Sequence, residues 1–546
     1  MKNIFTICMT SFLVLLSFQA CTEEELVTIN DPLELDENSI QYQQFMEERA
    51  IQLIKTYRFD KLGNTIDRIK DPVARERVLA LLTEYRTIAF NDALYFAKPN
   101  NDTIFFFPPN IEDRKEAKRI SFYFTSPGPV VNERGVLHGF KNFPKVESLE
   151  FTNSLATGIK DLNTLTELKK FKWEFIPYYF NELNPDIELV PLPLEFDFSQ
   201  NSKLENLSLN YAEMDNLKFP AHKIQSVGIG YSIIKKAEDI DAIAANTAII
   251  RWSTSEENEL VLKSKNIDSL FIDLAGLTSI DISETKLLTF DIMNVEKLKL
   301  NEGLKKLKLT ATNLTEKPSF PKDLQNLYLT DYKLQDKNLS AITGLKNFTI
   351  SCPGFDGLTV PTNVEELEFG IPWPYTAEVS SGINQDYSNL TKLKKVTIYN
   401  GTIDQAELVF PSNLEYIYFD SPQKMNGIGD YSNISSLKTF MGKYTNFEHA
   451  PKLPASLTKL DFFFLTLPSG STLDISNLTN LNYLRINATT KDTPFTLVLP
   501  TNLTEIAVKA GYGGINSARG SIILPAGSTI INAPAWLSQY VHIGNI

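Results

Sequence analysis

The feature that most constrains this chain is a short apolar pattern that returns at nearly even intervals from about residue 145 onward. In each copy two residues of any type separate the first apolar residue from the second, and one residue of any type separates the second from the third. Successive copies begin at Leu304, Leu324, Leu345 and Val364, and most steps are 17 to 24 residues. This period is typical of solenoids, in which each repeat buries its apolar face against its neighbours. The 546 residues therefore need not divide into several separate globular domains.

The copies alternate in how they begin. One kind begins with proline, as in residues 410–414 (FPSNL), and the other with Asn-Leu, as in residues 389–393 (NLTKL). Proline before a strand has no donor to lose and fixes φ at the corner, whereas Asn-Leu-Thr suits a short capped turn. The repeating unit is therefore predicted to be a pair of turns. Extra matches at 277–282 and 295–300 lie too close to the main copies for a full turn, and they predict short strands on the convex side.

The pattern resembles the leucine-rich repeat. Its consensus LxxLxLxx(N/C/T)xL appears nearly whole at residues 304–314 (LKKLKLTATNL) and 324–334 (LQNLYLTDYKL). The resemblance covers about residues 141–520 and implies an α/β repeat fold, a solenoid with a parallel β-ladder on its concave face and a mostly irregular or short-strand convex side. Thr312 and Tyr332 occupy the usual asparagine position, so we expect other side chains, and not an asparagine ladder, to close the turn after the strand. Irregular repeats of this kind are similar to those of bacterial adhesin- and internalin-like surface proteins.

The N-terminus reads as an export signal. Lys2 precedes an apolar run that is too short to span a bilayer and ends at Cys21. Residues 18–21 (FQAC) resemble a bacterial lipobox, which implies that residues 1–20 are a lipoprotein signal peptide and that Cys21 carries a lipid. The alternative is an ordinary cleavable signal with an incidental cysteine.

An acidic segment follows the cysteine. Residues 21–37 contain the run TEEE and no Lys or Arg, which predicts a solvated tether. The run resembles the export signal of Gram-negative lipoproteins displayed on the outer face of the outer membrane, so we expect an outer-membrane lipoprotein exposed at the cell surface. The alternative is that the charges only keep a linker extended. The net charge of −13 gives no attraction to nucleic acid or anionic lipid, so contact with the membrane is expected through the lipid alone.

The two ends of the repeats need caps, because a terminal turn leaves its apolar face bare. Residues 38–140 are predicted to form the N-terminal cap, with a pair of helices followed by strands at 104–107 and 120–124. Asp71 is placed to cap the second helix, with Pro72 at its first position. Residues 521–546 are predicted to form the C-terminal cap.

The sequence offers little chemistry. Once Cys8 leaves with the signal and Cys21 is lipidated, only Cys352 remains, so no internal disulfide can form. The four histidines, at 138, 222, 449 and 542, have no metal-ligand spacing, and Walker, HExxH and GxSxG motifs are absent. Carboxylates on neighbouring strands, such as Asp420 and Asp461, could pair as glycosidases require, but surface acids are usually solvated. We expect no metal, no cofactor and no enzymatic activity.

The candidate site is the exposed face of the ladder. Side chains alternate along a strand, so the residues between and beside the last two apolar positions point outward. Aromatic residues gather at these positions between 399 and 483, and Tyr and Arg on a rigid face are typical anchors of binding interfaces. The alternative is that the tyrosines pair across strands to stabilise the sheet. The predicted ligand-binding residues are Lys395, Tyr399, Tyr416, Tyr418, Asp420, Asp461, Phe463, Tyr483 and Arg485.

These observations predict a non-catalytic, surface-anchored protein that uses its concave face for protein–protein recognition or adhesion. The expected partner is a protein of a host or a neighbouring cell. Two alternatives stay open: the same rings could capture a polysaccharide, or the chain could be a structural envelope lipoprotein that needs no ligand.

Overall fold

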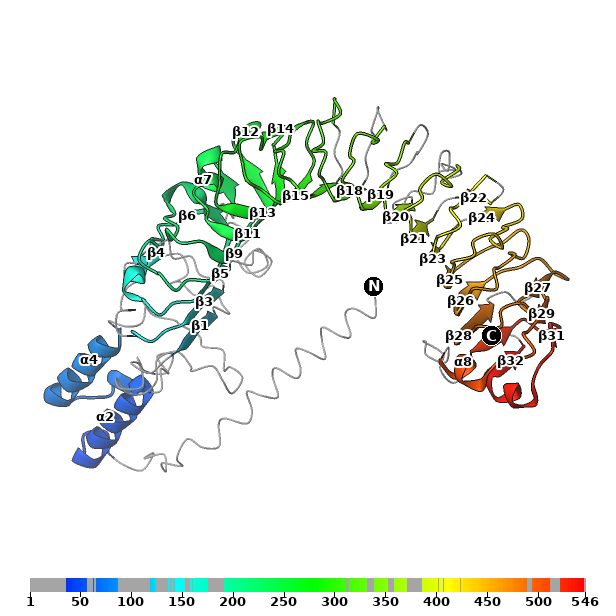
Figure 1. Cartoon of the computed structure of the whole chain (residues 1–546). Coiled ribbons are helices and arrows are strands. Elements are labelled where there is room, and N and C mark those ends of the chain that lie inside the picture. The colour runs from blue at the N-terminus through cyan, green and yellow to red at the C-terminus, as the bar shows by residue number, and fades with distance from the viewer. Residues whose placement is uncertain are drawn as a thin grey trace.

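The apolar pattern builds the molecule one strand per turn. In β18 (Asn326–Thr330), Leu327 and Leu329 are buried, while Tyr328 between them is only partly buried. Because alternate residues of a strand face opposite sides, each turn contributes two apolar side chains to the interior and two or three residues to the surface. In this computed structural model the turns stack into an arc, and the main ladder lines its concave side (Figure 1).

The structure describes residues 36–544 except 56–61, 63–64, 87–117, 124–135, 138–139, 141–142, 153–157, 160, 175–190, 311–313, 331–337, 352–357, 371–384, 401, 406, 423, 489–492 and 511–520. The signal peptide, Cys21, most of the tether and the predicted strand at 104–107 lie outside these residues, as do Thr312 and Tyr332.

The concave ladder is one continuous parallel sheet. Each ladder strand pairs in parallel with the next ladder strand along the chain, and a single apolar cluster runs behind them from Ile120 to Tyr540. The ladder strands are β1 (Arg119–Tyr123), β3 (Ser148–Thr152), β5 (Lys170–Glu174), β7 (Asn206–Asn210), β9 (Ile224–Gly230), β11 (Ala245–Ser255), β13 (Ile267–Ala275), β15 (Thr289–Met293), β17 (Lys306–Thr310), β18, β19 (Asn347–Ser351), β20 (Glu366–Gly370), β21 (Lys395–Tyr399), β23 (Tyr416–Asp420), β25 (Thr439–Lys443), β26 (Lys459–Leu465), β28 (Tyr483–Ala488), β30 (Ile522–Leu524) and β32 (Val541–Ile543).

The ladder extends beyond the predicted repeat limits of 141 and 520. Strand β1 lies inside the segment expected to be the N-terminal cap, yet it pairs with β3 over five residues. Strands β30 and β32 lie inside the expected C-terminal cap and continue the ladder from β28. The terminal turns therefore complete the same sheet.

The convex side carries short strands and few helices. Strands β14 (Ser279–Asp281) and β16 (Lys297–Lys299) confirm the two predicted from the extra matches. The other short strands are β2 (Val136–Leu137), β4 (Gly158–Ile159), β6 (Leu192–Pro193), β8 (Ala212–Glu213), β10 (Ile233–Ile234), β12 (Glu259–Val261), β22 (Thr402–Asp404), β24 (Lys424–Asn426), β27 (Thr472–Asp474), β29 (Thr496–Val498) and β31 (Thr529–Ile531). The helical turns among the repeats are α7 (Ala237–Asp241), α8 (Glu505–Ala510), η3 (Leu162–Thr164), η4 (Met214–Asn216) and η6 (Ala535–Tyr540).

The predicted helical pair is α2 (Ile40–Lys55) and α4 (Pro72–Arg86), which pack together around a small apolar cluster of their own (Figure 1). The predicted capping of the second helix by Asp71 is confirmed, since Asp71 Oδ1 accepts the backbone N–H of Val73 at 3.0 Å. Arg77 on α4 binds both carboxylate oxygens of Glu47 on α2 at 2.8 Å. No helix in the described part of the chain is both long and apolar enough to cross a membrane.

The turns that lead into the ladder are closed by two kinds of side chain. In five turns an aspartate Oδ1 accepts the backbone N–H of a serine two residues later, at 2.8 to 3.1 Å, which is an Asx turn. In three proline-first turns the asparagine before the first apolar residue donates to a carbonyl one turn back, at 2.7 to 2.9 Å. The pairs are Asp197/Ser199, Asp281/Ser283, Asp386/Ser388, Asp430/Ser432 and Asp474/Ser476, and then Asn363/Thr343, Asn413/Thr391 and Asn502/Thr479.

The turns that leave the ladder strands share a residue with positive φ. In eight turns a residue with φ between 51° and 63° follows the ladder strand or interrupts it near its end, and residues other than glycine rarely adopt this left-handed backbone conformation. In six of these turns the backbone N–H of this residue donates to a carbonyl of the next turn, as Ser421 N–H does to the carbonyl of Lys443 at 2.7 Å. These residues are Tyr211, Tyr231, Trp252, Asn294, Asn400, Ser421, Tyr444 and Phe464.

Candidate functional site

The candidate site lies on five neighbouring strands, β21, β23, β25, β26 and β28, whose register aligns the outward residues in rows. We call this surface the concave patch. Its first row is Lys395, Tyr416, Thr439, Lys459 and Tyr483; its second is Thr397, Tyr418, Met441, Asp461 and Arg485; its third is Tyr399, Asp420, Lys443, Phe463 and Asn487. The structure therefore brings all nine predicted concave-face residues onto one surface.

The middle row of the concave patch contains a bidentate ion pair between β26 and β28. Arg485 Nε and Nη2 lie 2.6 and 3.0 Å from the two carboxylate oxygens of Asp461. Asp461 was expected to point outward toward a ligand, but its side chain is only 3% exposed, against 17% for Arg485. Planar two-point pairing fixes the guanidinium as well as neutralising it. Asp461 thus holds Arg485 in place, and Arg485 also lies over the ring of Phe463, 5.0 Å from its centroid.

A second group of contacts joins the aromatic residues to Asp420. The hydroxyl of Tyr418 donates to Asp420 Oδ2 at 2.9 Å, and Lys443 Nζ lies 3.5 Å from the same oxygen. The ring of Tyr399 meets that of Tyr418 edge to face, with centroids 6.3 Å apart. These contacts fix the ring orientations, so they support the expectation that tyrosines steady the sheet. They also leave the rings ordered before any ligand arrives.

Lysines cover two of the tyrosines. Lys395 Nζ lies 5.8 Å from the ring centroid of Tyr416, and Lys459 Nζ lies 4.6 Å from that of Tyr483. These distances fit cation–π contacts. The first row of the concave patch therefore contains two lysine–tyrosine pairs, separated by Thr439.

Burial keeps the tyrosine hydroxyls protonated. Loss of solvent raises the pKa of Tyr399, Tyr416 and Tyr483 above the ordinary value. The pKa of Tyr418 is raised strongly, first by burial and then by its hydrogen bond to Asp420. These phenols are therefore neutral hydrogen-bonding groups at physiological pH.

In the middle of the patch the sequence shows an Asn-first repeat start at residues 433–437, but the apolar pattern that predicts the strand is incomplete there. Strand β25 has Gly442 where the third apolar residue should stand, so its outward residues Met441 and Lys443 were not predicted. A Cβ at Gly442 would lie 2.9 Å from the ring of Phe462 on the next strand, so the neighbouring ring occupies that place in the core. The pairing of Phe440 with Ile417 and Leu460 on the adjacent strands would have identified the copy.

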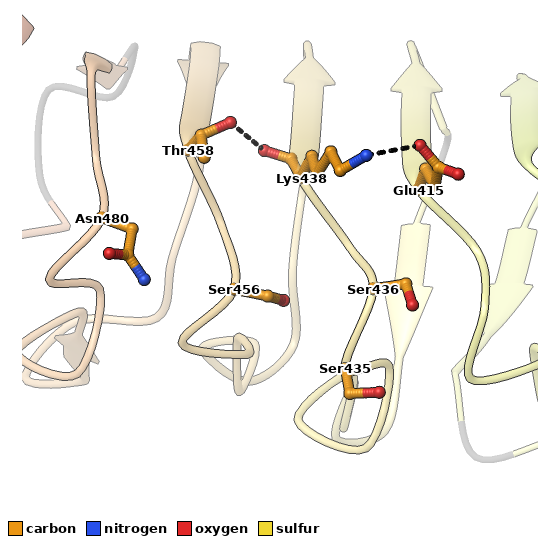
Figure 2. A pocket seen from close by; sticks show the side chains of 7 residues that line it. All are labelled: Glu415, Ser435, Ser436, Lys438, Ser456, Thr458 and Asn480. Carbon is orange, nitrogen blue, oxygen red and sulfur yellow. Dashed lines mark hydrogen bonds and ion pairs between the residues drawn. The ribbon is translucent and has the colours of Figure 1, made fainter.

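Two other candidates carry less chemistry. No cluster of three or more His, Cys, Asp or Glu side chains able to hold a metal ion occurs in the part of the chain that the structure describes. A shallow hollow of about 480 Å³ lies where the strands begin, and it is lined by serines, Thr458, Asn480 and the ion pair of Lys438 with Glu415 (Figure 2). It contains no aromatic ring, and its side chains are polar.

Comparisons with known proteins find similarity among solved structures. No family model and no curated protein matches the chain. Among solved structures, an internalin from Listeria monocytogenes is 14% identical over 74% of this chain and 88% of its own, with a TM-score of 0.25. The functional domain of InlJ from the same species is 15% identical over 67% of this chain and 77% of its own, with a TM-score of 0.30.

A plant structure gives a similar match. The Arabidopsis receptor kinase HAESA, solved with the peptide hormone IDA and the co-receptor SERK1, is 13% identical over 75% of this chain and 76% of its own, with a TM-score of 0.28. The chain is a parallel-strand solenoid of the leucine-rich-repeat type with little helix.

Proposed function

We propose that this chain is a non-catalytic binding protein that recognises a protein ligand through the concave patch. The observation that carries the proposal is the pre-ordered set of Tyr416, Tyr418, Tyr483, Phe463 and Arg485 on one rigid curved sheet. Large aromatic side chains and arginine dominate the energetics of protein interfaces because they offer much contact area at low entropic cost.

The internal contacts of the patch support this proposal. A ligand would not have to order the rings, because Asp420 already holds Tyr418 and Asp461 already holds Arg485. Pre-organisation of this kind lowers the entropic cost of association. At strand spacings of about 4.8 Å, the five strands span roughly 20 Å, so the patch forms the centre of an interface of about 800 Å² per partner whose rim is the flanking turns.

The proposal also includes the location of the molecule. Residues 1–20 direct export, Cys21 carries the lipid, residues 21–37 form the tether, and the solenoid is displayed on the outer face of a Gram-negative cell. Digestion of intact cells with protease, followed by blotting for the chain, tests this location. Loss of the chain is expected; survival until the envelope is lysed would place it in the periplasm.

The binding role is tested with a photo-crosslinking amino acid at position 418. The matched control carries the same group at position 349, because Thr349 is the middle outward residue of β19 as Tyr418 is of β23. We expect the full chain to form a discrete protein adduct from position 418 and not from position 349. Identical adducts from both positions, or none from position 418 in the presence of host or neighbouring cells, would contradict the proposal.

A further inference from the structure

Three aromatic residues stand at the exits of neighbouring ladder strands in a conformation that bulky side chains rarely adopt. Tyr211 follows β7, Tyr231 follows β9, and Trp252 interrupts the regular register of β11, with φ of 60°, 51° and 51°. Of the other five exits, two use Asn, which tolerates positive φ more readily, one uses Ser, and two use the aromatic residues Tyr444 and Phe464. Strained residues persist where the surrounding structure holds them, and such residues gather at functional sites.

The three rings stack along the axis of the solenoid, and we call them the edge stack. The centroids of Tyr211 and Tyr231 are 5.1 Å apart with an interplanar angle of 8°. Those of Tyr231 and Trp252 are 5.2 Å apart with an angle of 27°. Tyr231 is 42% exposed and Trp252 63%, although tryptophan is usually among the more buried residues.

Two buried serines hold the backbone beside these rings. The hydroxyl of Ser253 donates to the carbonyl of Arg251 and accepts the N–H of Ser232, both at 3.0 Å. The hydroxyl of Ser232 in turn donates to the carbonyl of Gly230 at 2.8 Å and accepts the N–H of Ala212 at 3.0 Å. The strained position of each ring is therefore fixed from one turn to the next.

The edge stack ends with an uncovered ring face at Trp252. Ile250 pairs with Ile272 and Ser253 with Leu274, so Arg251 and Trp252 together lie opposite the single residue Asp273. The next turn thus has no residue equivalent to Trp252, and in the described part of the chain the indole stacks on Tyr231 alone. Tyr231 covers one face of the indole, and among the described residues no ring lies against the face toward β13.

A similar stack near the concave patch serves as a comparison. Tyr444 and Phe464 stack with centroids 4.7 Å apart, and the register shift there also follows the last ring. Phe464, however, packs against Phe463 at 4.2 Å and is only partly exposed. The terminal ring of that stack therefore packs against a neighbouring ring, whereas Trp252 remains mostly exposed.

We propose that the edge stack is a glycan-binding site in which the uncovered face of Trp252 stacks on a pyranose ring. Aromatic side chains present about 150–250 Å² each, so the exposed parts of Tyr231 and Trp252 total on the order of 250 Å². A stable protein interface needs about 800 Å² per partner. The area therefore fits a ligand the size of one or two sugar rings.

The polar neighbours suit a sugar. The aliphatic C–H face of a pyranose packs on the electron-rich face of an indole, while its equatorial hydroxyls need donors and acceptors at the rim. Arg251 is exposed and Asp273 partly exposed beside Trp252, and neither takes part in an ion pair within the described residues. The guanidinium supplies donors and the carboxylate supplies acceptors.

Affinity electrophoresis tests the site with the mature chain and native gels containing laminarin, yeast mannan, galactomannan or xylan. We expect at least one polysaccharide to retard the chain and Trp252→Ala to abolish the retardation. Trp252→Phe should keep part of it, and Tyr416→Ala with Tyr418→Ala should not change it. Trp252→Gly relieves the positive φ, so it should lose binding while keeping a thermal unfolding midpoint no lower than that of the parent.

Three results would overturn the proposal. Absence of retardation by all four polysaccharides, or equal retardation of Trp252→Gly and the parent, excludes a glycan site at the indole. A parent dimer that becomes monomeric in Trp252→Gly by analytical ultracentrifugation would identify the edge stack as a contact between copies of the chain. Loss of retardation in the concave-patch variant, with Trp252→Gly unaffected, would move glycan capture to the concave face.

Discussion

The concave face differs sharply between strands β17 to β19 and the concave patch on β21 to β28. The outward residues of the first stretch, which we call the plain stretch, are Lys306, Lys308 and Thr310, then Asn326, Tyr328 and Thr330, then Asn347, Thr349 and Ser351. They contain one aromatic ring. Behind them, the two regions bury their alternate apolar residues in the same way. The ladder therefore depends on the inward residues, and the outward residues are free to differ.

The contacts on the two surfaces differ accordingly. In the plain stretch, Asn347 bonds Asn326 at 2.7 Å and Lys308 lies 3.5 Å from Asp291 on the neighbouring strand, with 44% of the lysine side chain exposed. In the concave patch, the pair of Asp461 and Arg485 is largely buried. A single long ion pair in solvent contributes little, whereas a buried bidentate pair makes each partner dependent on the other.

The largest expected effect distinguishes inward from outward residues. Phe419→Ala should reduce the free energy of unfolding by about 3–5 kcal/mol, because the ring is fully buried against Tyr431 and Phe440. Tyr418→Ala, one position away on the outer face, should cost less than about 1.5 kcal/mol. Urea unfolding followed by circular dichroism measures both. Equal losses would mean that the outer rings carry the sheet.

The second effect distinguishes the two surfaces. Asp461→Ala leaves Arg485 unpaired and largely buried, and should cost about 2–3 kcal/mol. Asp291→Ala removes the partly buried partner of the exposed Lys308, at a longer distance of 3.5 Å, and should cost less than about 1 kcal/mol. The double variant Asp461→Leu with Arg485→Leu should recover most of the loss in the same unfolding measurement. A small cost for Asp461→Ala would show that the patch is not pre-ordered by this pair.

The third effect should be the same inside and outside the concave patch. Asn413→Ala and Asn363→Ala each remove a hydrogen bond to the carbonyl of the preceding turn, and each should cost about 1 kcal/mol. Ser412→Ala, at an exposed neighbouring position, serves as the control and should cost almost nothing. If only Asn413→Ala lowers the free energy of unfolding, this hydrogen bond matters in the concave patch and is not a general feature of the repeat.

The smallest expected effect is on the stability of the fold at acidic pH. The hydrogen bond from Ser432 lowers the pKa of Asp430, and that from Ser199 lowers the pKa of Asp197. A lowered pKa stabilises the fold above the unfolded value near 4, and this contribution is lost as the pH falls through the lower folded value. Asp430→Asn should therefore narrow the gap between the unfolding midpoints at pH 7 and pH 3. An unchanged gap would remove this Asx turn from the acid response.

Much of the fold follows from the sequence because the signal is local. Two apolar residues separated by one residue must lie on the same face of a strand, and this fixes the inward set at Leu327 and Leu329 as at Ile417 and Phe419. Strands β14 and β16 followed from the same spacing. Strand β25 does not match the pattern because Gly442 stands at its third apolar position, where the ring of Phe462 from the next strand fills the core. A glycine compensated by a ring of the neighbouring turn cannot be recognised within a single repeat.

The site was predictable in its positions and not in its contacts. Outward residues such as Tyr416 and Tyr483 follow from alternation, but the pairing of Asp461 with Arg485 depends on the register between strands 24 positions apart. The edge stack depends on the sign of φ at Tyr211, Tyr231 and Trp252. Its trace in the sequence is an aromatic residue followed by a small residue directly after a strand pattern, as in Tyr231-Ser232.

The most direct test of the central claim measures the affinity of the partner crosslinked at position 418. The chain with Tyr416→Ala, Tyr418→Ala and Tyr483→Ala is compared with a control carrying Lys308→Ala, Tyr328→Ala and Thr349→Ala in the plain stretch. We expect the first variant to keep its fold but to lose at least about a hundredfold in affinity, and the control to bind as the parent does. Parental affinity in the first variant, or equal losses in both, would contradict a binding site at the concave patch.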